Sequence, residues 1–257
     1  MADRSRPLAR ISTQYARNGP LLSESREYVR LVARGLQKEE RRRVLVLENG
    51  LGRQTYKARR NIFEALEARF ADQRRAADLG LLSLSSAPSK AFSVGALIEL
   101  ARHDLLIQKF VSFLVRHIGL PIGMIDARRF LDELDTEDGS AGRWSPSLRR
   151  RAESSLNAIP SHFELWSETI DGSVPAVHIP IELAALIVQE RLEAGSGPIN
   201  AVEFDMLGLR AAEVIELLWA CARRNWFSVD VVGNVVRVEQ KFKDLSSLLD
   251  AGAGAWA

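Results

Sequence analysis

The chain has 257 residues and a formal net charge of +2, with 46% hydrophobic and 26% charged residues. This is the composition of a folded globular protein, and it excludes a chain that is mainly disordered, collagen-like or of low complexity. No apolar run approaches the roughly 20 residues that a membrane-spanning helix needs, so we expect no membrane association. The N-terminus lacks the apolar core of a secretory signal, and the single cysteine forms no internal disulfide, so we expect a cytoplasmic protein.

The small net charge conceals an uneven distribution along the chain. Residues 1–90 contain 19 Lys and Arg against 10 Asp and Glu, whereas residues 161–257 contain 7 against 14. Arginine accounts for 29 of the 35 basic residues, and its guanidinium group forms paired hydrogen bonds with phosphate. The basic half therefore suggests a polyanionic partner. A genome that favours arginine codons explains the same bias, so charge alone leaves both interpretations open.

The N-terminal third predicts a basic arm followed by three helices. Residues 1–20 alternate arginine with proline and glycine and indicate a flexible basic arm. Ser23 is a good N-cap for the first helix, and Thr55 is a good N-cap for the third. The approximate bounds of the three predicted helices are 23–35, 38–47 and 55–70.

The helical period of 3.6 residues gives the third helix two distinct faces. The apolar stripe comprises Tyr56, Ile62, Phe63, Leu66 and Phe70. The opposite face comprises Lys57, Arg60, Asn61 and Glu64. Arg59 lies on the apolar stripe, so we expect it to pack or pair structurally. A short helix, a turn of about seven residues and a helix with a basic outer face together are typical of a helix-turn-helix.

The middle of the chain predicts a second unit of the same kind. Residues 74–90 indicate a connection. The elements predicted after it are helices at 93–100, 104–117 and 126–134 and an acidic turn at 135–142. Ser145 followed by Pro146 is a strong helix start, and the helix from there to about Ala158 presents Arg150 and Arg151 outward. Beyond it, residues 163–166 and 176–179 favour a hairpin in the position of the wing of a winged helix.

The C-terminal part predicts two further helices and a hairpin. The predicted elements are a helix at 181–193, a linker at 195–198, a helix at 211–223 and a hairpin of 227–231 with 235–239. From Asp244 onward we expect a frayed tail. The sequence thus indicates a mainly α protein with two helix-turn-helix or winged-helix-like units and short β-hairpins. The predicted parts are an arm at 1–20, a first unit at 21–90, a second unit at 91–195 and a C-terminal helix with hairpin at 196–257.

We find no pattern that predicts catalysis or a cofactor. The four histidines share no metal-ligand spacing, and Cys221 lies within a predicted amphipathic helix. Gly50 to Gly52 lacks the third glycine and the preceding strand of a phosphate-binding loop. The acidic run around Asp135 is typical of a solvated turn. We therefore expect a protein that is not an enzyme and holds no metal and no cofactor.

What remains is binding, and the basic helical faces suit nucleic acid. Arg and Lys can reach guanine, Asn and Gln can pair with adenine, and a helix N-terminus favours phosphate. For a single helix an ordinary solvated face explains the same residues, but two such helices and a basic arm favour DNA. The candidate DNA-binding residues are Arg53, Gln54, Lys57, Arg60, Asn61, Arg41, Arg42, Arg43, Arg143, Arg149, Arg150 and Arg151.

Three stretches resemble a known family. The run Arg-Trp-Ser-Pro-Ser-Leu-Arg-Arg-Arg at 143–151 looks like the Trp-Ser-x-Ser-Thr-Arg/Lys motif of the BrxA family of BREX phage-defence systems. Residues 222–227 and 233–239 resemble that family's closing hairpin, and the helix at 55–70 is similar, more loosely, to its N-terminal Arg-rich helix. Pro146-Ser147-Leu148 where a Thr often stands, together with the long basic arm, departs from the family pattern.

The resemblance implies two helix-turn-helix-like units, double-stranded DNA binding without catalysis, and action beside other BREX proteins. It implies structural roles for Trp144 and Ser145 and DNA-facing roles for the arginines at 149–151. Members of the family are sometimes labelled inner-membrane proteins, which the lack of a spanning segment argues against. Two alternatives stay open: a helical adaptor that docks other defence subunits through its acidic C-terminal third, and an RNA-binding helical protein, although the stacking aromatics of common RNA modules are missing.

Overall fold

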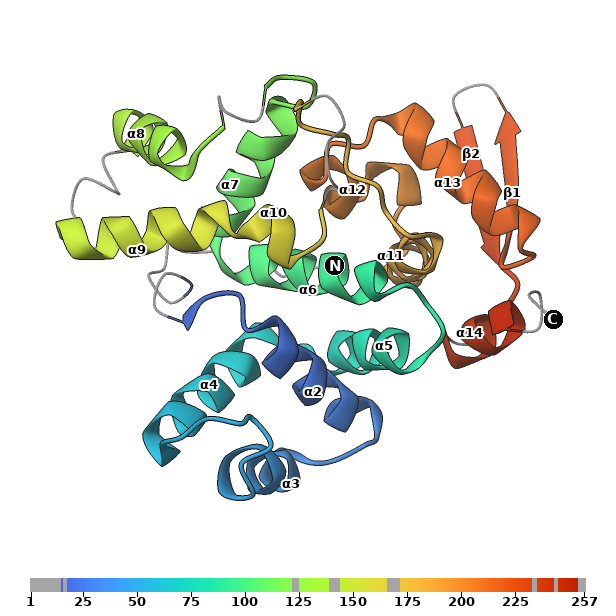
Figure 1. The fold of residues 1–257 in the computed structure, drawn as a ribbon. Helices are drawn as coiled ribbons and strands as arrows, with labels where there is room; N and C mark the ends of the chain where they lie inside the picture. The colour runs from blue at the N-terminus through green and yellow to red at the C-terminus, as the bar shows by residue number, and fades with distance from the viewer. Residues whose placement is uncertain are drawn as a thin grey trace.

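The computed structural model describes residue 15 and residues 18–121, 125–138, 144–165, 172–232, 235–242 and 245–253. Over these ranges the protein is mainly helical, as the sequence predicted, with one antiparallel pair of strands where two hairpins were expected (Figure 1). None of the helices in these ranges combines the length and the apolar character needed to cross a membrane. The predicted arm at residues 1–20 lies almost wholly outside the described residues.

The three helices predicted for the N-terminal third are confirmed, but Ser23 lies within the first of them and Leu21 occupies the N-cap position. The helices are α2 (Leu22–Ala33), α3 (Lys38–Arg42) with the π-helical turn η1 (Arg43–Leu47), and α4 (Tyr56–Arg69). Thr55 caps α4 as predicted, because its Oγ1 accepts a hydrogen bond of 3.2 Å from the amide of Ala58. Tyr28 of α2 donates a hydrogen bond of 2.7 Å to Glu67 of α4, which joins the first and last of these helices.

The connection predicted at residues 74–90 is wrong, because most of it is the helix α5 (Gln73–Leu84). Asp72 caps this helix, and its carboxylate accepts hydrogen bonds from the amides of Arg74 and Arg75. The helix packs along α2 through Gly80, which leaves no room for a side chain there. A glycine within the helix and a serine-rich end are typical of loops, so local sequence favoured a connection although tertiary packing determines a helix.

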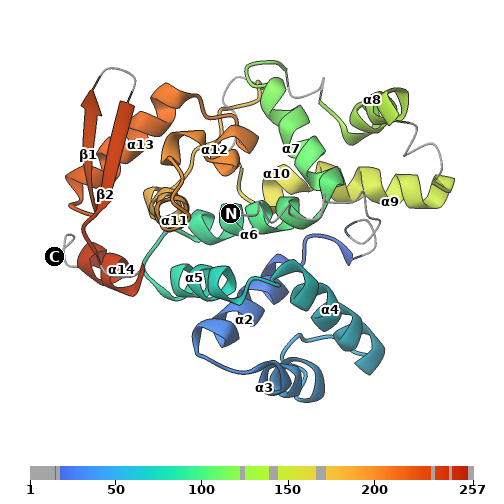
Figure 2. The same ribbon diagram turned by 180° about the vertical axis from the view of Figure 1, so that it is seen from behind.

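Helix α6 (Ser89–His103) lies at the centre of the protein, between the N-terminal helices and the rest (Figure 2). All residues from Ala91 to Ala101 are buried, and α6 contacts α2, α4, α5 and the following helix α7 (Leu105–Arg116). The sequence predicted only residues 93–100 of this helix. Periodicity underestimates a helix that is buried on all sides, because such a helix has no polar face.

The next three helices are α8 (Ala127–Asp138), α9 (Pro146–Asn157) and the short α10 (Ile159–His162). The start of α9 is as predicted, since Ser145 Oγ accepts a hydrogen bond of 3.3 Å from the amide of Leu148. The predicted acidic turn at 135–142 is partly wrong: helix α8 continues to Asp138, and residues 139–143 lie outside the described ranges. Pairing of Asp135 with Arg149 of α9 favours the extra helical turn.

The wing predicted from 163–166 and 176–179 does not form among the described residues. Leu165 follows α10 without strand structure, and residues 176–179 are irregular. Instead, Val174 pairs with the segment after α7, donating a hydrogen bond of 2.8 Å to the carbonyl of Leu120 and accepting one of 2.8 Å from Gly119. The described residues therefore contain no wing, and the winged-helix prediction is not confirmed.

The predicted helices at 181–193 and 211–223 and the hairpin that follows are confirmed, whereas the short helices η3 and α12 between them were not predicted. The C-terminal elements are α11 (Ile181–Glu193), η3 (Pro198–Asn200), α12 (Val202–Met206), α13 (Ala211–Arg223), β1 (Phe227–Val232), β2 (Val235–Gln240) and α14 (Leu245–Ala253). The two strands pair antiparallel, with Val229 opposite Val238. The frayed tail expected from Asp244 is wrong, since α14 buries Leu245 and Leu248.

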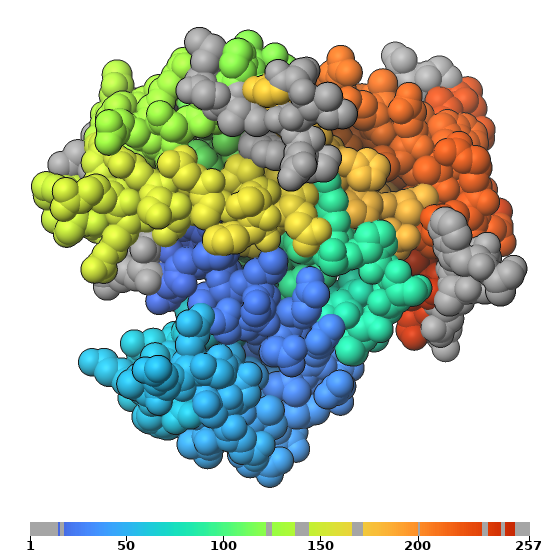
Figure 3. Space-filling model, viewed as in Figure 1, coloured from blue at the N-terminus to red at the C-terminus, as the bar shows by residue number. Residues whose placement is uncertain are grey.

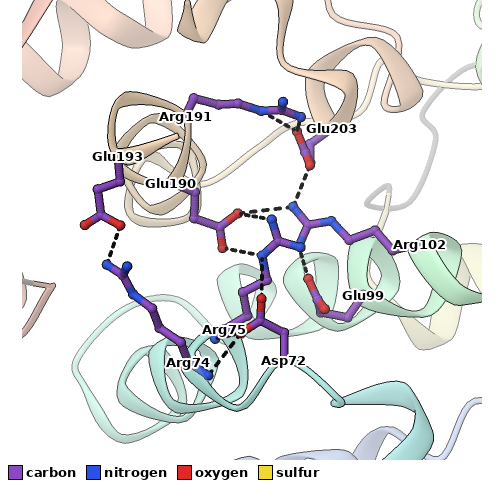
Figure 4. Close-up of polar contacts among 9 residues, drawn as sticks. All are labelled: Asp72, Arg74, Arg75, Glu99, Arg102, Glu190, Arg191, Glu193 and Glu203. Carbon is purple, nitrogen blue, oxygen red and sulfur yellow. Dashed lines mark hydrogen bonds and ion pairs between the residues drawn. The ribbon is translucent and has the colours of Figure 1, made fainter. Parts of the chain in front are cut away.

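A buried ionic cluster joins the two halves of the chain (Figure 4). Arg102 of α6 donates hydrogen bonds to Glu203 of α12 (2.5 Å) and Glu190 of α11 (3.2 Å) and pairs with Glu99. Arg75 of α5 reaches the same Glu190 at 3.1 Å. Burial alone would raise the pKa of Glu203, but Arg102 and a second arginine outweigh it and lower that pKa to about 2. Glu203 is therefore ionised at neutral pH, and the cluster couples α5, α6, α11 and α12.

Candidate nucleic-acid interface

The two faces predicted for α4 are confirmed. Ile62, Phe63 and Leu66 are buried, whereas Lys57 and Asn61 are exposed. Exposed residues on the opposite face and before the helix also include Gln54, Arg60 and Glu64. The helix is therefore held to the core by one side and presents a polar side to solvent.

Tyr56 is a correction to the predicted apolar stripe. It is 44% exposed, and its hydroxyl accepts a hydrogen bond of 3.4 Å from Arg42. Tyr56 is the first residue of α4, one turn or more before the buried Ile62 and Phe63. Arg59, which the sequence placed on the same stripe, is partly buried as expected for a structural residue.

The basic side chains in and just before the first turn of α4 differ in whether a carboxylate pairs with them. Within the described ranges Lys57 forms no ion pair and no hydrogen bond. Arg60 pairs with Glu64 one turn later, at 3.3 Å, and Arg53 pairs with Glu24 of α2. Both arginine side chains stay about half exposed, but Glu24 is buried whereas Glu64 is exposed. The exposed Arg60–Glu64 pair contributes little to stability and exchanges readily with another anion.

The arginine run at 41–43 is divided by the structure. Arg42 and Arg43 are exposed in large part and pair at 3.9 and 3.3 Å with nearby glutamates. Arg41 is a correction, because it is only 5% exposed and cannot face a ligand. Its guanidinium donates hydrogen bonds to the carbonyl of Leu36 (2.7 Å) and to Glu67 (3.0 Å) and lies over the ring of Tyr28. Arg41 therefore binds α2, α3 and α4 together.

The second basic face lies on α9. Arg150 and Arg151 are exposed, and within the described ranges neither has an ion-pair or hydrogen-bond partner. Ala152 and Leu156 face the core, as predicted. Arg143, the first arginine of the motif, lies outside the described residues.

Arg149 is a second correction to the candidate set. Its guanidinium binds Asp135 of α8 at 2.7 Å and Asp132 of α8 at 2.5 Å, and it lies 3.5 Å from Glu153 one turn along α9. Three carboxylates therefore neutralise this arginine, and it holds α8 against α9. The motif places Arg149 beside Arg150 in the sequence, but the helical period turns the two side chains toward different surroundings.

One exposed cation was missed by the sequence. Arg128, in the first turn of α8, is exposed, and no partner for it is found among the described residues. The amide of the preceding Ala127 donates a hydrogen bond of 2.8 Å to Asn157, which places Arg128 beside the end of α9. The adjacent pair Arg128-Arg129 could have indicated a basic surface here. In the sequence alone, the same pair is equally typical of the solvated face of an ordinary helix.

The two basic helices reach the same side of the molecule. The first turns of α4 and α9 lie on the left in Figure 1 and on the right in the reverse view of Figure 2. In the space-filling view the blue residues before and within α2 lie between α9, in yellow, and α4, in cyan (Figure 3). A single elongated polyanion along this side would meet both helices.

The described residues give little support for a metal site or a reactive cysteine. Over the described ranges no three His, Cys, Asp or Glu side chains gather as metal ligands do. Cys221 is fully buried, and burial raises the pKa of its thiol to about 12. The thiol is therefore neutral and inaccessible, the state of a structural cysteine.

Comparisons with known proteins give the fold and leave the function open. No protein-family model matches the chain, and no curated protein matches it. A crystal structure of an uncharacterized protein from Magnetospirillum magneticum is similar, with a TM-score of 0.53, 16% sequence identity and coverage of 72% of this chain and 95% of that chain. At this identity the similarity shows a shared fold alone.

Proposed function

We propose that this protein binds double-stranded DNA without catalysis and that it acts in the cytoplasm in a BREX-type phage-defence system. The observation that carries the proposal is that α4 and α9, whose first turns lie on the same side of the molecule, each carry exposed cations without partners among the described residues (Figure 1). Lys57 of α4 and the pair Arg150 and Arg151 of α9 have no carboxylate to satisfy them among the described residues. Cations left free on a shared side favour a polyanionic ligand.

The arrangement favours phosphate contacts over base recognition. Lys57 and the partly paired Arg53 and Arg60 gather at the first turn of α4, where the helix N-terminus adds a partial positive charge. Gln54 and Asn61 are the exposed amides able to reach base edges. With so few such groups we expect low sequence preference and strong salt dependence.

The link to BREX defence rests on the sequence resemblance. The structural roles that the resemblance implies agree with two local observations: Ser145 caps α9, and Trp144 packs partly buried against the core. These contacts support the motif at 144–151 as a structural signature. Of the arginines to which the motif points, Arg150 and Arg151 remain in the proposal and Arg149 does not.

The decisive experiment measures binding of the purified chain to random double-stranded DNA over a salt series. On B-DNA the logarithm of the association constant falls against log salt with a slope of about −0.9 per phosphate neutralised. We expect Lys57→Glu with Arg60→Glu, and separately Arg150→Glu with Arg151→Glu, to flatten that line by about two units each. Arg223→Glu with Lys241→Glu is the matched control, because both residues are exposed and lie at the α13 and β2 end of the fold.

Three outcomes separate the candidate functions. Loss of binding in both interface variants but not in the control supports the proposal. Equal loss of binding in all three variants would show that the effect depends on net charge and not on the faces of α4 and α9. If the wild-type chain does not bind at low salt, the DNA function fails, and pull-down of defence subunits by the same variants tests the adaptor alternative. A parallel series on double-stranded RNA addresses the RNA alternative.

A further inference from the structure

A cavity of about 510 Å³ lies where the start of α6 meets the C-terminal elements. Its walls come from the connection between α5 and α6, the start of α11, and the helices α13 and α14. Most of the lining is apolar and includes Pro88, Ile179, Leu217, Trp226 and Leu249. Cavities of roughly 300–1,000 Å³ with apolar walls and a few polar groups are the usual form of small-molecule sites. This cavity has that size and that character.

Three charged side chains line the cavity, and two of them pair with each other. The Nη1 atom of Arg224 lies 3.4 Å from Oε1 of Glu182 in α11, and the Arg224 guanidinium lies over the ring of Trp226. Lys90 of α6 forms no ion pair within the described ranges. Its ammonium donates a long hydrogen bond of 3.4 Å to the carbonyl of Leu165. Among the described lining residues, Lys90 is therefore the cation that no carboxylate pairs with.

The carboxylate whose charge acts on Lys90 is already engaged. Glu164 accepts hydrogen bonds from the hydroxyls of Ser93 (2.8 Å) and Ser89 (3.1 Å). Burial lowers the pKa of Lys90, and the charge of Glu164 opposes that decrease only in part. The ammonium is thus poorly solvated and incompletely compensated. An anion within the cavity would stabilise its charged form.

We propose that this cavity binds a small molecule with an apolar body and one carboxylate, with Lys90 pairing with the carboxylate and Leu217, Trp226 and Leu249 enclosing the apolar body. The helices α6 and α11 both begin at the cavity, after Pro88 and Pro180, and neither proline caps its helix with a side chain. The partial positive charge of each N-terminus adds to that of Lys90. The site is separate from the proposed DNA interface, because none of its residues belongs to α4 or α9.

Calorimetric titration of the purified chain with matched probes tests the site. 1-Naphthylacetate carries a ring and a carboxylate, 1-naphthylacetamide carries the same ring without the charge, and octanoate carries an alkyl chain in place of the ring. We expect one carboxylate probe per chain, with naphthylacetate binding about tenfold or more tightly than its amide, because a hydrogen bond to a charged group is lost in the amide. Raised salt should weaken binding of naphthylacetate and leave binding of the amide unchanged. Tighter binding of octanoate than of naphthylacetate would assign an alkyl body to the ligand, and the reverse order a ring.

Substitutions separate the cation from the cavity. Lys90→Gln should lower the affinity for naphthylacetate about tenfold and leave that for the amide within about twofold. Lys57→Gln is the matched control, because Lys57 is an exposed lysine on α4 that lacks a partner among the described residues, and it should change neither affinity. Ala220→Phe from α13 and Leu249→Trp from α14 fill the cavity from two different helices and should weaken both probes. Circular dichroism identifies which of the variants are folded.

Two sets of results would overturn the site. Equal affinity of the wild-type chain for naphthylacetate and its amide, or an unchanged affinity in Lys90→Gln, would remove the role of the cation and with it the carboxylate ligand. Absence of binding of both naphthylacetate and octanoate at millimolar concentration, or binding that persists in both folded cavity-filling variants, would remove the cavity as the binding site. Neither result bears on DNA binding, which the salt series measures separately.

Discussion

Gly80 of α5 lies against the backbone of Val29 in α2. A Cβ atom at position 80 would overlap the carbonyl oxygen of Val29 and stand 2.6 Å from the Cβ of Ala33. The two helices therefore approach each other as closely as backbones allow, which is possible only because residue 80 has no side chain. This crossing fixes the position of α2 and, through it, of the helices that carry the basic face of α4.

We predict that Gly80→Ala lowers the free energy of unfolding. A methyl group forced into a packed contact costs about 1–3 kcal/mol, and this outweighs the gain of about 1 kcal/mol that alanine brings within a helix. Chemical denaturation measures the difference. Leu84→Ala, at the exposed end of the same helix, is the control and should cost less than about 1 kcal/mol. An unchanged or increased stability for Gly80→Ala would contradict the close crossing.

Arg149 and Arg150 make a matched pair of substitutions. Arg149→Met removes the cation that three carboxylates share, and we expect the free energy of unfolding to fall by about 1–2 kcal/mol. DNA affinity per folded molecule should stay within twofold of the wild type. Arg150→Met should do the reverse, lowering affinity and changing stability by less than about 0.5 kcal/mol. Equal loss of DNA affinity in both variants would indicate that Arg149 also contacts DNA.

Asp78 of α5 gives a pH-dependent prediction. Burial raises its pKa to about 6; Arg74 opposes the increase, and Glu190 and Glu193 of α11 add to it. Because the folded state holds the proton more tightly than the unfolded state, this contribution to stability is present below about pH 4 and is lost as pH rises through 6.

Asp78→Asn should therefore raise the free energy of unfolding at pH 8, by about 2 kcal/mol, and leave it unchanged at pH 4. Urea denaturation at the two pH values measures both. The comparison at pH 4 serves as the internal control, because the wild-type carboxyl is then protonated. A variant that changes stability equally at pH 4 and pH 8 would show that Asp78 does not titrate in this range.

The sequence predicted the helices that combine a cap with one apolar face. Thr55 and Ser145 set the starts of α4 and α9, and apolar positions at helical spacing set the extent of α13. Helices without such a signal were missed or shortened. Helix α5 contains Gly80 and ends in serines, and α6 is buried all round.

The candidate site was predictable as a surface but not residue by residue. Helical spacing placed Lys57, Asn61, Arg150 and Arg151 outward, and they are exposed. It could not separate Arg41 from its two arginine neighbours, because the groups that bury it lie on α2 and at the far end of α4. Long-range pairing has no signature in a local pattern, and it decides which arginines remain available to a ligand.

The ionic cluster that joins α5 and α6 to α11 and α12 affects how the chain matures during synthesis. Arg75 and Glu190 are 115 residues apart, and Arg102 reaches Glu203 over 101 residues. Until α11 and α12 have been synthesised, Arg75 and Arg102 lack the partners that Glu190 and Glu203 provide. Completion of the N-terminal half thus waits until residue 203 has left the exit tunnel. A premature stop before that point would release a chain in which Arg102 lacks Glu203 and keeps only its local partner Glu99 among these residues.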